Sequence, residues 1–252
     1  MPGWPAVDPN RRRDVALPPR AARRGESVKN SKVRPEPKVE RVAVRNDSDA
    51  EKEDSLIAAI EAADRVSVDR VFDLVKFYQN TGRPLEAVAW LEPLTGHHIP
   101  SARDLAWLVL GNMAEQAGDF AKAVAYYERG LQEEPRKRLV LYFMHNNLGY
   151  SLSKVGEYQR AEEHCRAAIA VSNDRYNAHK NLGIALEGQG YWFAAALAYV
   201  DAVTADDCDA RPLIHLENLI AAHPEVEKLL PRFTSLMESC RRLEQLRLKR
   251  FH

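Results

Sequence analysis

The sequence predicts an all-α protein built from stacked antiparallel helix pairs, and three regularities carry this prediction. A Leu-Gly dipeptide recurs at intervals of 38 and 34 residues, as Leu110-Gly111, Leu148-Gly149 and Leu182-Gly183. A second glycine follows seven residues after each, as Gly118, Gly156 and Gly190. An alanine follows twelve residues after each first glycine, as Ala123, Ala161 and Ala195. A period of this length is typical of helical hairpins that each pack on their neighbours.

Residues 1–48 come first and are predicted to form a disordered, basic tail. Residues 1–46 hold 12 Lys and Arg against 5 Asp and Glu, together with seven of the 14 prolines. Such a segment buries too little apolar surface to offset the entropy of ordering it. Three interpretations of the charge stay open: a solvated leader, a contact with the acidic remainder of the same chain, or a contact with an anionic partner such as a nucleic acid or a membrane surface.

Residues 49–66 are expected to hold one leading helix over Ser55–Asp64, with an apolar stripe of Leu56, Ile57 and Ile60. A first, degenerate hairpin follows from Ser67, a plausible N-cap residue. Gly82 is expected to end the first helix of this hairpin, and Pro84 suits the first turn of the second.

Three clearer hairpins follow, so that four repeats together occupy 67–209. The first of these is predicted to start after Pro100-Ser101, turn at Gly118 and end at Glu134. The next is predicted over 142–171 with a turn at Gly156, and the last over 175–205 with a turn at Gly190. The longer interval of 38 residues places four extra residues at 136–141, in a loop or in an added first helical turn. Residues 210–252 lose the phase and are expected to cap the stack, with a helix from Pro212, a break at His223-Pro224 and a restart at Pro231.

The hairpins resemble the tetratricopeptide repeat, whose signature is W-x2-L-G-x2-Y, then A-x3-F, then P. The second copy matches it with Trp107, Leu110, Gly111, Ala123, Tyr127 and Pro135. The resemblance implies a right-handed superhelix whose first helices line a concave groove. It also implies a non-catalytic adaptor or scaffold that binds an extended or helical segment of another protein.

Each repeated slot has a physical reason. The first glycine and the alanine let two helices approach closely, and the second glycine provides a left-handed backbone at the helix end. His145 and His179 occupy the slot of Trp107 and are expected to be half-buried packing residues. Glu115 and Glu187 are expected to lie on a solvated face.

The resemblance places the candidate partner-binding residues on the face of the first helices. These residues are Lys76, Leu108, Asn112, Phe143, Asn146, Asn147, Tyr150, Asn177, Lys180, Asn181 and Ile184. Five of them are asparagine, a poor helix former whose amide can both donate to and accept from a peptide backbone. We therefore expect the asparagines to hold the main chain of a bound segment. The alternative is that they cap, bridge between helices or face water.

One subtype of the family, which holds chain-terminal carboxylates, is disfavoured. Its cation slots hold Leu108, Asn177 and Asn181 in this chain, so the charge-assisted hydrogen bonds of that recognition are missing. The alternative function is an adaptor tethered to nucleic acid or membrane by its basic tail. A homodimer through the C-terminal helix at Leu243–Phe251 is a further possibility.

Catalysis, cofactors and metals are not expected. His97-His98 has no carboxylate or cysteine at ligand spacing, and Cys165 occupies a core slot beside His164. The three cysteines lack a C-x-x-C pattern, and no apolar run approaches the roughly 18 residues of a membrane span. We expect a cytoplasmic protein.

Overall fold

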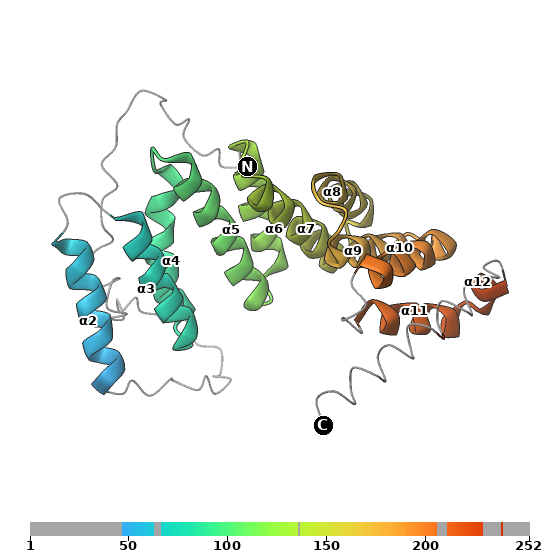
Figure 1. Cartoon of the computed structure of the whole chain (residues 1–252), viewed down its shortest axis with the longest axis horizontal. Helices are drawn as coiled ribbons and strands as arrows, with labels where there is room; N and C mark the ends of the chain where they lie inside the picture. The colour runs from blue at the N-terminus through green and yellow to red at the C-terminus, as the bar shows by residue number, and fades with distance from the viewer. Residues whose placement is uncertain (1–46, 63–66, 136, 206–210, 229–237, 239–252) are drawn as a thin grey trace, which may run out of the picture. The chain divides into compact units, whose positions relative to one another are not determined.

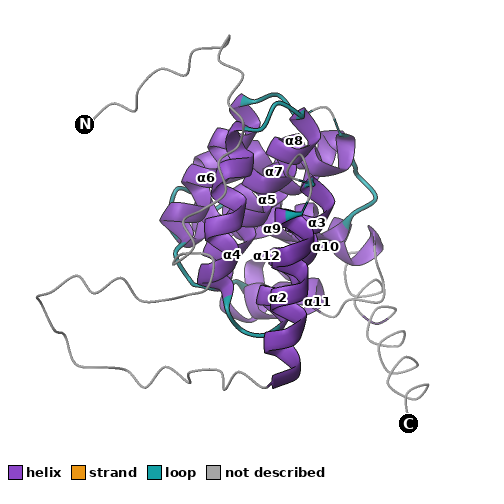
Figure 2. Cartoon of the chain, turned by 90° about the vertical axis from the view of Figure 1, so that its left-hand side faces the viewer, coloured by secondary structure: helices purple, strands orange, loops and turns teal. Residues whose placement is uncertain are grey.

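The computed structural model describes residues 47–62, 67–135, 137–205, 211–228 and 238 (Figure 1). Within these ranges every regular element is a helix, and none is a strand, so the all-α prediction is confirmed. Figure 2 shows the helices in purple, joined by short loops. The chain divides into two compact units, Met1–Leu110 and Gly111–His252, and each is described by itself.

The first unit contains α2 (Asp47–Glu61), α3 (Val68–Asn80), α4 (Pro84–Leu91) and the 3-10 helix η1 (Glu92–Gly96). Helix α5 (Pro100–Gln116) begins in this unit and ends in the second. Helix α2 starts eight residues before the predicted Ser55, because acidic side chains at Asp47 and Asp49 suit the positive end of a helix. Ser67 occupies the N-cap position of α3 as expected, but its side chain makes no capping hydrogen bond.

A buried ion pair holds α2 against the α3–α4 turn. Glu53 of α2 has a side chain with 0% exposure, and it accepts a hydrogen bond from Tyr78 Oη at 3.1 Å. Arg83, at the start of α4, donates to both carboxylate oxygens of Glu53. Its guanidinium also lies over the Tyr78 ring, 5.0 Å from the centroid. Helix α2 is therefore held against the first hairpin by this ion pair and by the burial of Ile57 and Ile60.

The second unit contains the end of α5 and seven more described helices. These are α6 (Phe120–Gln132), α7 (Arg138–Lys154), α8 (Tyr158–Val171), α9 (Tyr176–Gly188), α10 (Trp192–Ala205), α11 (Arg211–Ala222) and α12 (Pro224–Lys228). Helix α7 has 17 residues and α9 has 13. The four extra residues in the long interval are therefore an added first turn of α7, which is one of the two possibilities the sequence left open.

Both glycines of the repeat do what their positions predict. Gly118, Gly156 and Gly190 have φ of 76°, 84° and 80°, the left-handed conformation that ends the first helix of each hairpin. A Cβ built on Gly149 would lie 2.5 Å from Cys165 Sγ, so α7 and α8 can pack this closely only without a side chain there.

The C-terminal helices differ from the prediction at one point. His223-Pro224 does end α11, but the next helix begins at Pro224 itself, because proline fits the first position of a helix. Val226 of α12 is buried in one apolar cluster with Leu213 and Leu216 of α11 and with residues of α10. The predicted restart at Pro231, the proposed dimer helix at Leu243–Phe251 and residues 1–46 of the basic tail lie outside the described residues. Residues 47 and 48, which were assigned to the tail, are helical and begin α2.

Candidate functional site

The eleven predicted binding residues fall in both units. Lys76 and Leu108 belong to the first unit, where Lys76 is exposed and Leu108 is buried, with 7% of its surface exposed. The other nine belong to the second unit and lie on the end of α5, on α7 and on α9. The second unit therefore holds the part of the predicted site whose geometry can be built from contacts.

An amide hydrogen bond joins α5 to α7. Asn147 Nδ2 donates to Asn112 Oδ1 at 2.7 Å, and the Tyr127 hydroxyl of α6 donates to the same oxygen at 2.8 Å. The Asn112 carbonyl thus receives two donors, one from its own hairpin and one from the next. This arrangement fixes the rotamers of both asparagines.

The chain of amides continues from α7 to α9. Asn146 Nδ2 donates to Asn147 Oδ1 at 2.8 Å, and Asn181 Nδ2 donates to Asn146 Oδ1 at 3.1 Å. Asn146 and Asn181 are buried, with 7% and 3% of their surface exposed. Asn181 Oδ1 is buried and has no hydrogen-bond partner among the described residues. We call Asn112, Asn146, Asn147 and Asn181 the amide ladder.

The amide ladder shows what four of the five asparagines do in the free protein. Four of the five bridge neighbouring helices, which is the alternative that the sequence left open. Buried polar groups must be hydrogen-bonded to be tolerated, and these residues satisfy most of that need with one another. Whether they also contact a bound main chain stays a prediction.

Two glutamates were wrongly expected to face solvent. Glu115 Oε1 accepts a hydrogen bond from Ser151 Oγ at 2.6 Å, and burial raises the pKa of this carboxyl above its ordinary value. Glu187 Oε2 accepts from the Tyr199 hydroxyl at 2.6 Å. Each glutamate lies four residues after a first glycine, and a tyrosine lies sixteen after it. The third hairpin has Ser153 and Cys165 at these two positions. Because the glutamate and the tyrosine are either both present or both replaced, the sequence already indicated that the two residues interact.

The remaining predicted residues of the second unit are only partly buried. We call them, with Asn112, the first-helix face: Asn112, Phe143, Tyr150, Asn177, Lys180 and Ile184. The Phe143 ring lies under the Arg175 guanidinium, 5.6 Å from it, and Tyr150 packs edge-on against Phe120 at 5.9 Å. These contacts hold both rings in place, so the face offers aromatic and aliphatic surface over a rigid polar layer.

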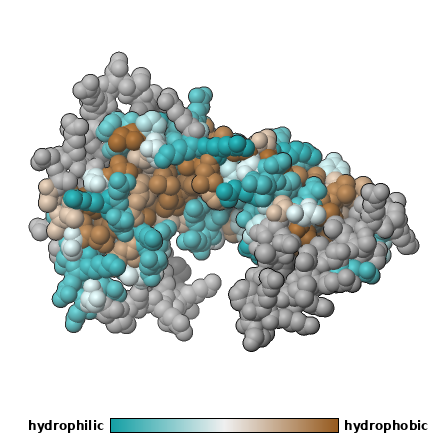
Figure 3. Space-filling view, viewed as in Figure 1, coloured by the Kyte–Doolittle hydropathy of each residue, from teal (hydrophilic) through white to brown (hydrophobic). Residues whose placement is uncertain are grey.

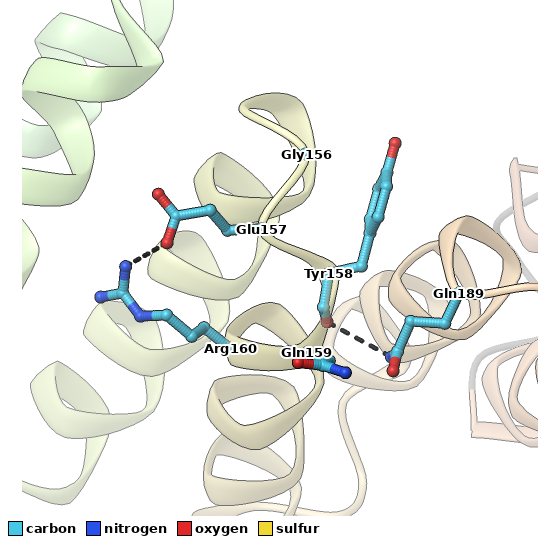
Figure 4. Close-up of a pocket in the computed structure, with 6 residues that line it drawn as sticks. All are labelled: Gly156, Glu157, Tyr158, Gln159, Arg160 and Gln189. Atoms are coloured by element: carbon cyan, nitrogen blue, oxygen red, sulfur yellow. Dashed lines mark hydrogen bonds and ion pairs between the residues drawn. The ribbon is translucent and has the colours of Figure 1, made fainter.

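A separate surface pocket of about 410 Å³ lies at the α7–α8 turn and the end of α9 (Figure 4). Arg160 pairs with Glu157 and with Glu128 of α6, and Gln189 Nε2 donates to the Tyr158 carbonyl at 3.4 Å. The polar groups of this pocket are thus bonded to one another across hairpins. None of the predicted binding residues lines it.

Other kinds of site were sought over the same described ranges. No group of three or more potential metal ligands occurs in them, and no helix in them is both long and apolar enough to span a membrane. Figure 3 shows hydrophobic areas interrupting a largely hydrophilic surface. The exposed large apolar side chains of the second unit include Leu139, Tyr191, Phe193 and Leu197. Cys165 is fully buried, and burial raises the pKa of its thiol to about 12, so it stays protonated at neutral pH.

Comparison with known proteins agrees with this architecture. Two tetratricopeptide repeat family models match residues 104–137 and 146–177. Among solved structures, MamA (residues 41 to the end) from Desulfovibrio magneticus RS-1 is similar, with 21% identity and a TM-score of 0.56 over 71% of this chain and 95% of its own. The MamA RS-1 ArsTM double mutant is similar to the same extent, with 21% identity and a TM-score of 0.57 over 71% and 96%. No curated protein matches the chain. At these identities the two structures support the fold alone.

Proposed function

Because the chain belongs to the tetratricopeptide repeat family, we propose that it is a non-catalytic adaptor that binds a segment of another protein. The segment lies along the first-helix face of the second unit. The observation that carries this proposal is the combination of partly exposed aromatic and aliphatic side chains with a bonded amide layer beneath them.

The proposed contacts follow from the chemistry of that face. Phe143, Tyr150 and Ile184 provide apolar surface whose removal from water favours association. The aromatic rings lose little conformational freedom on binding, because Arg175 and Phe120 already hold them. Asn177 and Lys180 supply polar groups at the same face, where a peptide main chain has both donors and acceptors.

The amide ladder has a supporting part in this proposal. Its hydrogen bonds keep α5, α7 and α9 in a fixed register, so the spacing of the residues above it is fixed before a partner arrives. The ladder asparagines thus stabilise the face in the free protein.

The experiment compares proteins captured by the immobilised full chain and by two variants. Tyr150→Ser/Ile184→Ser alters the first-helix face, and Tyr191→Ser/Leu197→Ser alters exposed residues at α10. We expect partners of the unmodified chain to be lost, by about tenfold or more, only with the first variant. Thermal melting checks that both variants fold. Equal capture by both variants would contradict the proposal.

A further inference from the structure

Two half-buried histidines meet between α7 and α8. His145 Nδ1 and His164 Nδ1 are 3.0 Å apart, which is hydrogen-bonding distance. The ring centroids lie 5.3 Å apart and the ring planes are inclined by 28°. The two nitrogens therefore point at one another between the rings, and one must carry a hydrogen while the other offers a lone pair.

This geometry fits a shared proton and does not fit a metal. A metal ion binds histidine nitrogens at about 2.0–2.1 Å along their lone pairs. Among the described residues, no third His, Cys, Asp or Glu completes a metal-binding group with this pair. The pair is thus a hydrogen bond of two neutral imidazoles, and its existence depends on the protonation state.

Each added proton acts on the pair differently. The first can go onto Nε2 of the donor ring and leaves the hydrogen bond intact, but it places a charge in a half-buried site. The second must go onto Nδ1 of the acceptor ring, where it removes the lone pair and puts two positive charges in contact. Burial, with His164 nearby, lowers the pKa of His145 to about 4, and burial with Arg160 nearby lowers the pKa of His164.

The charged groups around the pair oppose protonation further. Besides burial, the positive charge of Arg160 in α8 lowers the pKa of His164. The Arg160 guanidinium is itself paired with Glu157 and with Glu128 of α6. From α9, Lys180 acts on the neighbouring Cys165 thiol. Glu128 of α6 is thus engaged by Arg160, and Glu162 of α8 is engaged by Arg166.

We propose that His145 and His164 form a proton-sensing joint that loosens α7 from α8 on acidification. Helix α7 also carries Phe143, Asn146, Asn147 and Tyr150, so the loosened joint disturbs the first-helix face. The same slots in the other hairpins cannot act in this way. They hold Trp107 and Tyr126 in the second, and His179 and Ala198 in the fourth.

The sign of the pH effect follows from the lowered folded-state pKa values. Above the ordinary histidine pKa of about 6.5 both states are neutral and the stability is full. Below this pH the histidines protonate in the unfolded chain, while the pair stays neutral in the folded protein. The free energy of unfolding therefore falls from about pH 6.5 towards pH 4. The folding equilibrium constant should drop on the order of 10- to 100-fold through this pair over that interval.

The test uses the full chain and needs no partner, so it is independent of the proposed function. Denaturant unfolding is measured between about pH 8 and pH 4.5 for the unmodified chain and for His145→Trp/His164→Tyr, the pair taken from the second hairpin. We expect the variant to lose at least tenfold less of its equilibrium constant over this range. His98→Gln, at an exposed histidine, is the control and should behave like the unmodified chain.

A second measurement covers the case in which the variant does not fold. Imidazole NMR of the unmodified chain should show His145 and His164 titrating well below the ordinary histidine pKa of about 6.5. Titration of His145 and His164 near pH 6.5, or the same pH dependence in the variant and the unmodified chain, would overturn the proposal.

Discussion

Single side chains decide how closely the helices of each hairpin approach. Gly111 and Gly183 pack against the rings of Tyr127 and Tyr199, where a built Cβ would lie 2.2 and 2.4 Å from ring carbons. In the third hairpin Gly149 instead faces the smaller Cys165. The space is thus filled by the side chain opposite the glycine, and any side chain on the glycine itself would displace it.

We expect Gly149→Leu to destabilise the protein by about 1–3 kcal/mol, because the leucine overpacks the α7–α8 contact. Thermal melting of the full chain measures this. Ala170→Leu, at an exposed position of the same helix pair, is the matched control and should melt close to the unmodified chain. A melting temperature unchanged by Gly149→Leu would contradict the packing.

The sequence predicted these small-residue contacts correctly, but it predicted the asparagines and glutamates less well. A glycine at a fixed interval has one physical meaning at a helix contact, and the interval is visible in the sequence. An asparagine can bond to a ligand, to solvent or to another asparagine, and the choice depends here on side chains 35 residues away. Only the structure shows that Asn112, Asn147, Asn146 and Asn181 bond in succession.

Individual elements are held by contacts outside the repeat pattern. Helix α2 precedes the repeats, and its buried Glu53 is satisfied by Arg83 and Tyr78. The pKa of the Arg83 guanidinium is raised, chiefly by its hydrogen bond to Glu53. Burying the Glu53 carboxylate costs free energy, and this cost offsets part of what the ion pair contributes to stability.

Removal of one partner should therefore cost more than removal of both. We expect Arg83→Met to destabilise the chain by about 3–5 kcal/mol, because it leaves the Glu53 carboxylate buried and unpaired with a cation. The double variant Glu53→Gln/Arg83→Met removes the charge as well and should recover a large part of this loss. Denaturant unfolding measures both. Equal destabilisation by the single and double variants would show that the pair is not electrostatically coupled.

Element boundaries were predicted best where a glycine or proline marks them. Gly82 has a φ of 71°, and Pro84 begins α4, both as expected. The start of α7 lacked such a residue, so the sequence left a loop and an added turn as equal possibilities. The start of α2 was predicted too late along the chain because the prediction relied on a stripe of apolar residues. The first turn of α2 is acidic, so it lies before that stripe begins.

At the scale of the whole molecule, the repeat pattern supports the proposed adaptor function. The division into a tail, a leading helix, four repeats and a cap stays a prediction, as does a cytoplasmic location. The candidate site was predicted as one continuous set of eleven residues. The described contacts join only the part on α5, α7 and α9 of the second unit, and several members of that part are buried beneath the others.

Photo-crosslinking tests the central claim most directly. Tyr150 of the first-helix face and Tyr191, at the start of α10, are each replaced in the full chain by the photoreactive tyrosine analogue p-benzoylphenylalanine. Both are aromatic, and Tyr191 is 57% exposed, so accessibility alone favours the control position. We predict a specific adduct with a partner protein from position 150 and its absence from position 191. Adducts from position 191 alone, or the same adducts from both, would contradict binding along the first-helix face.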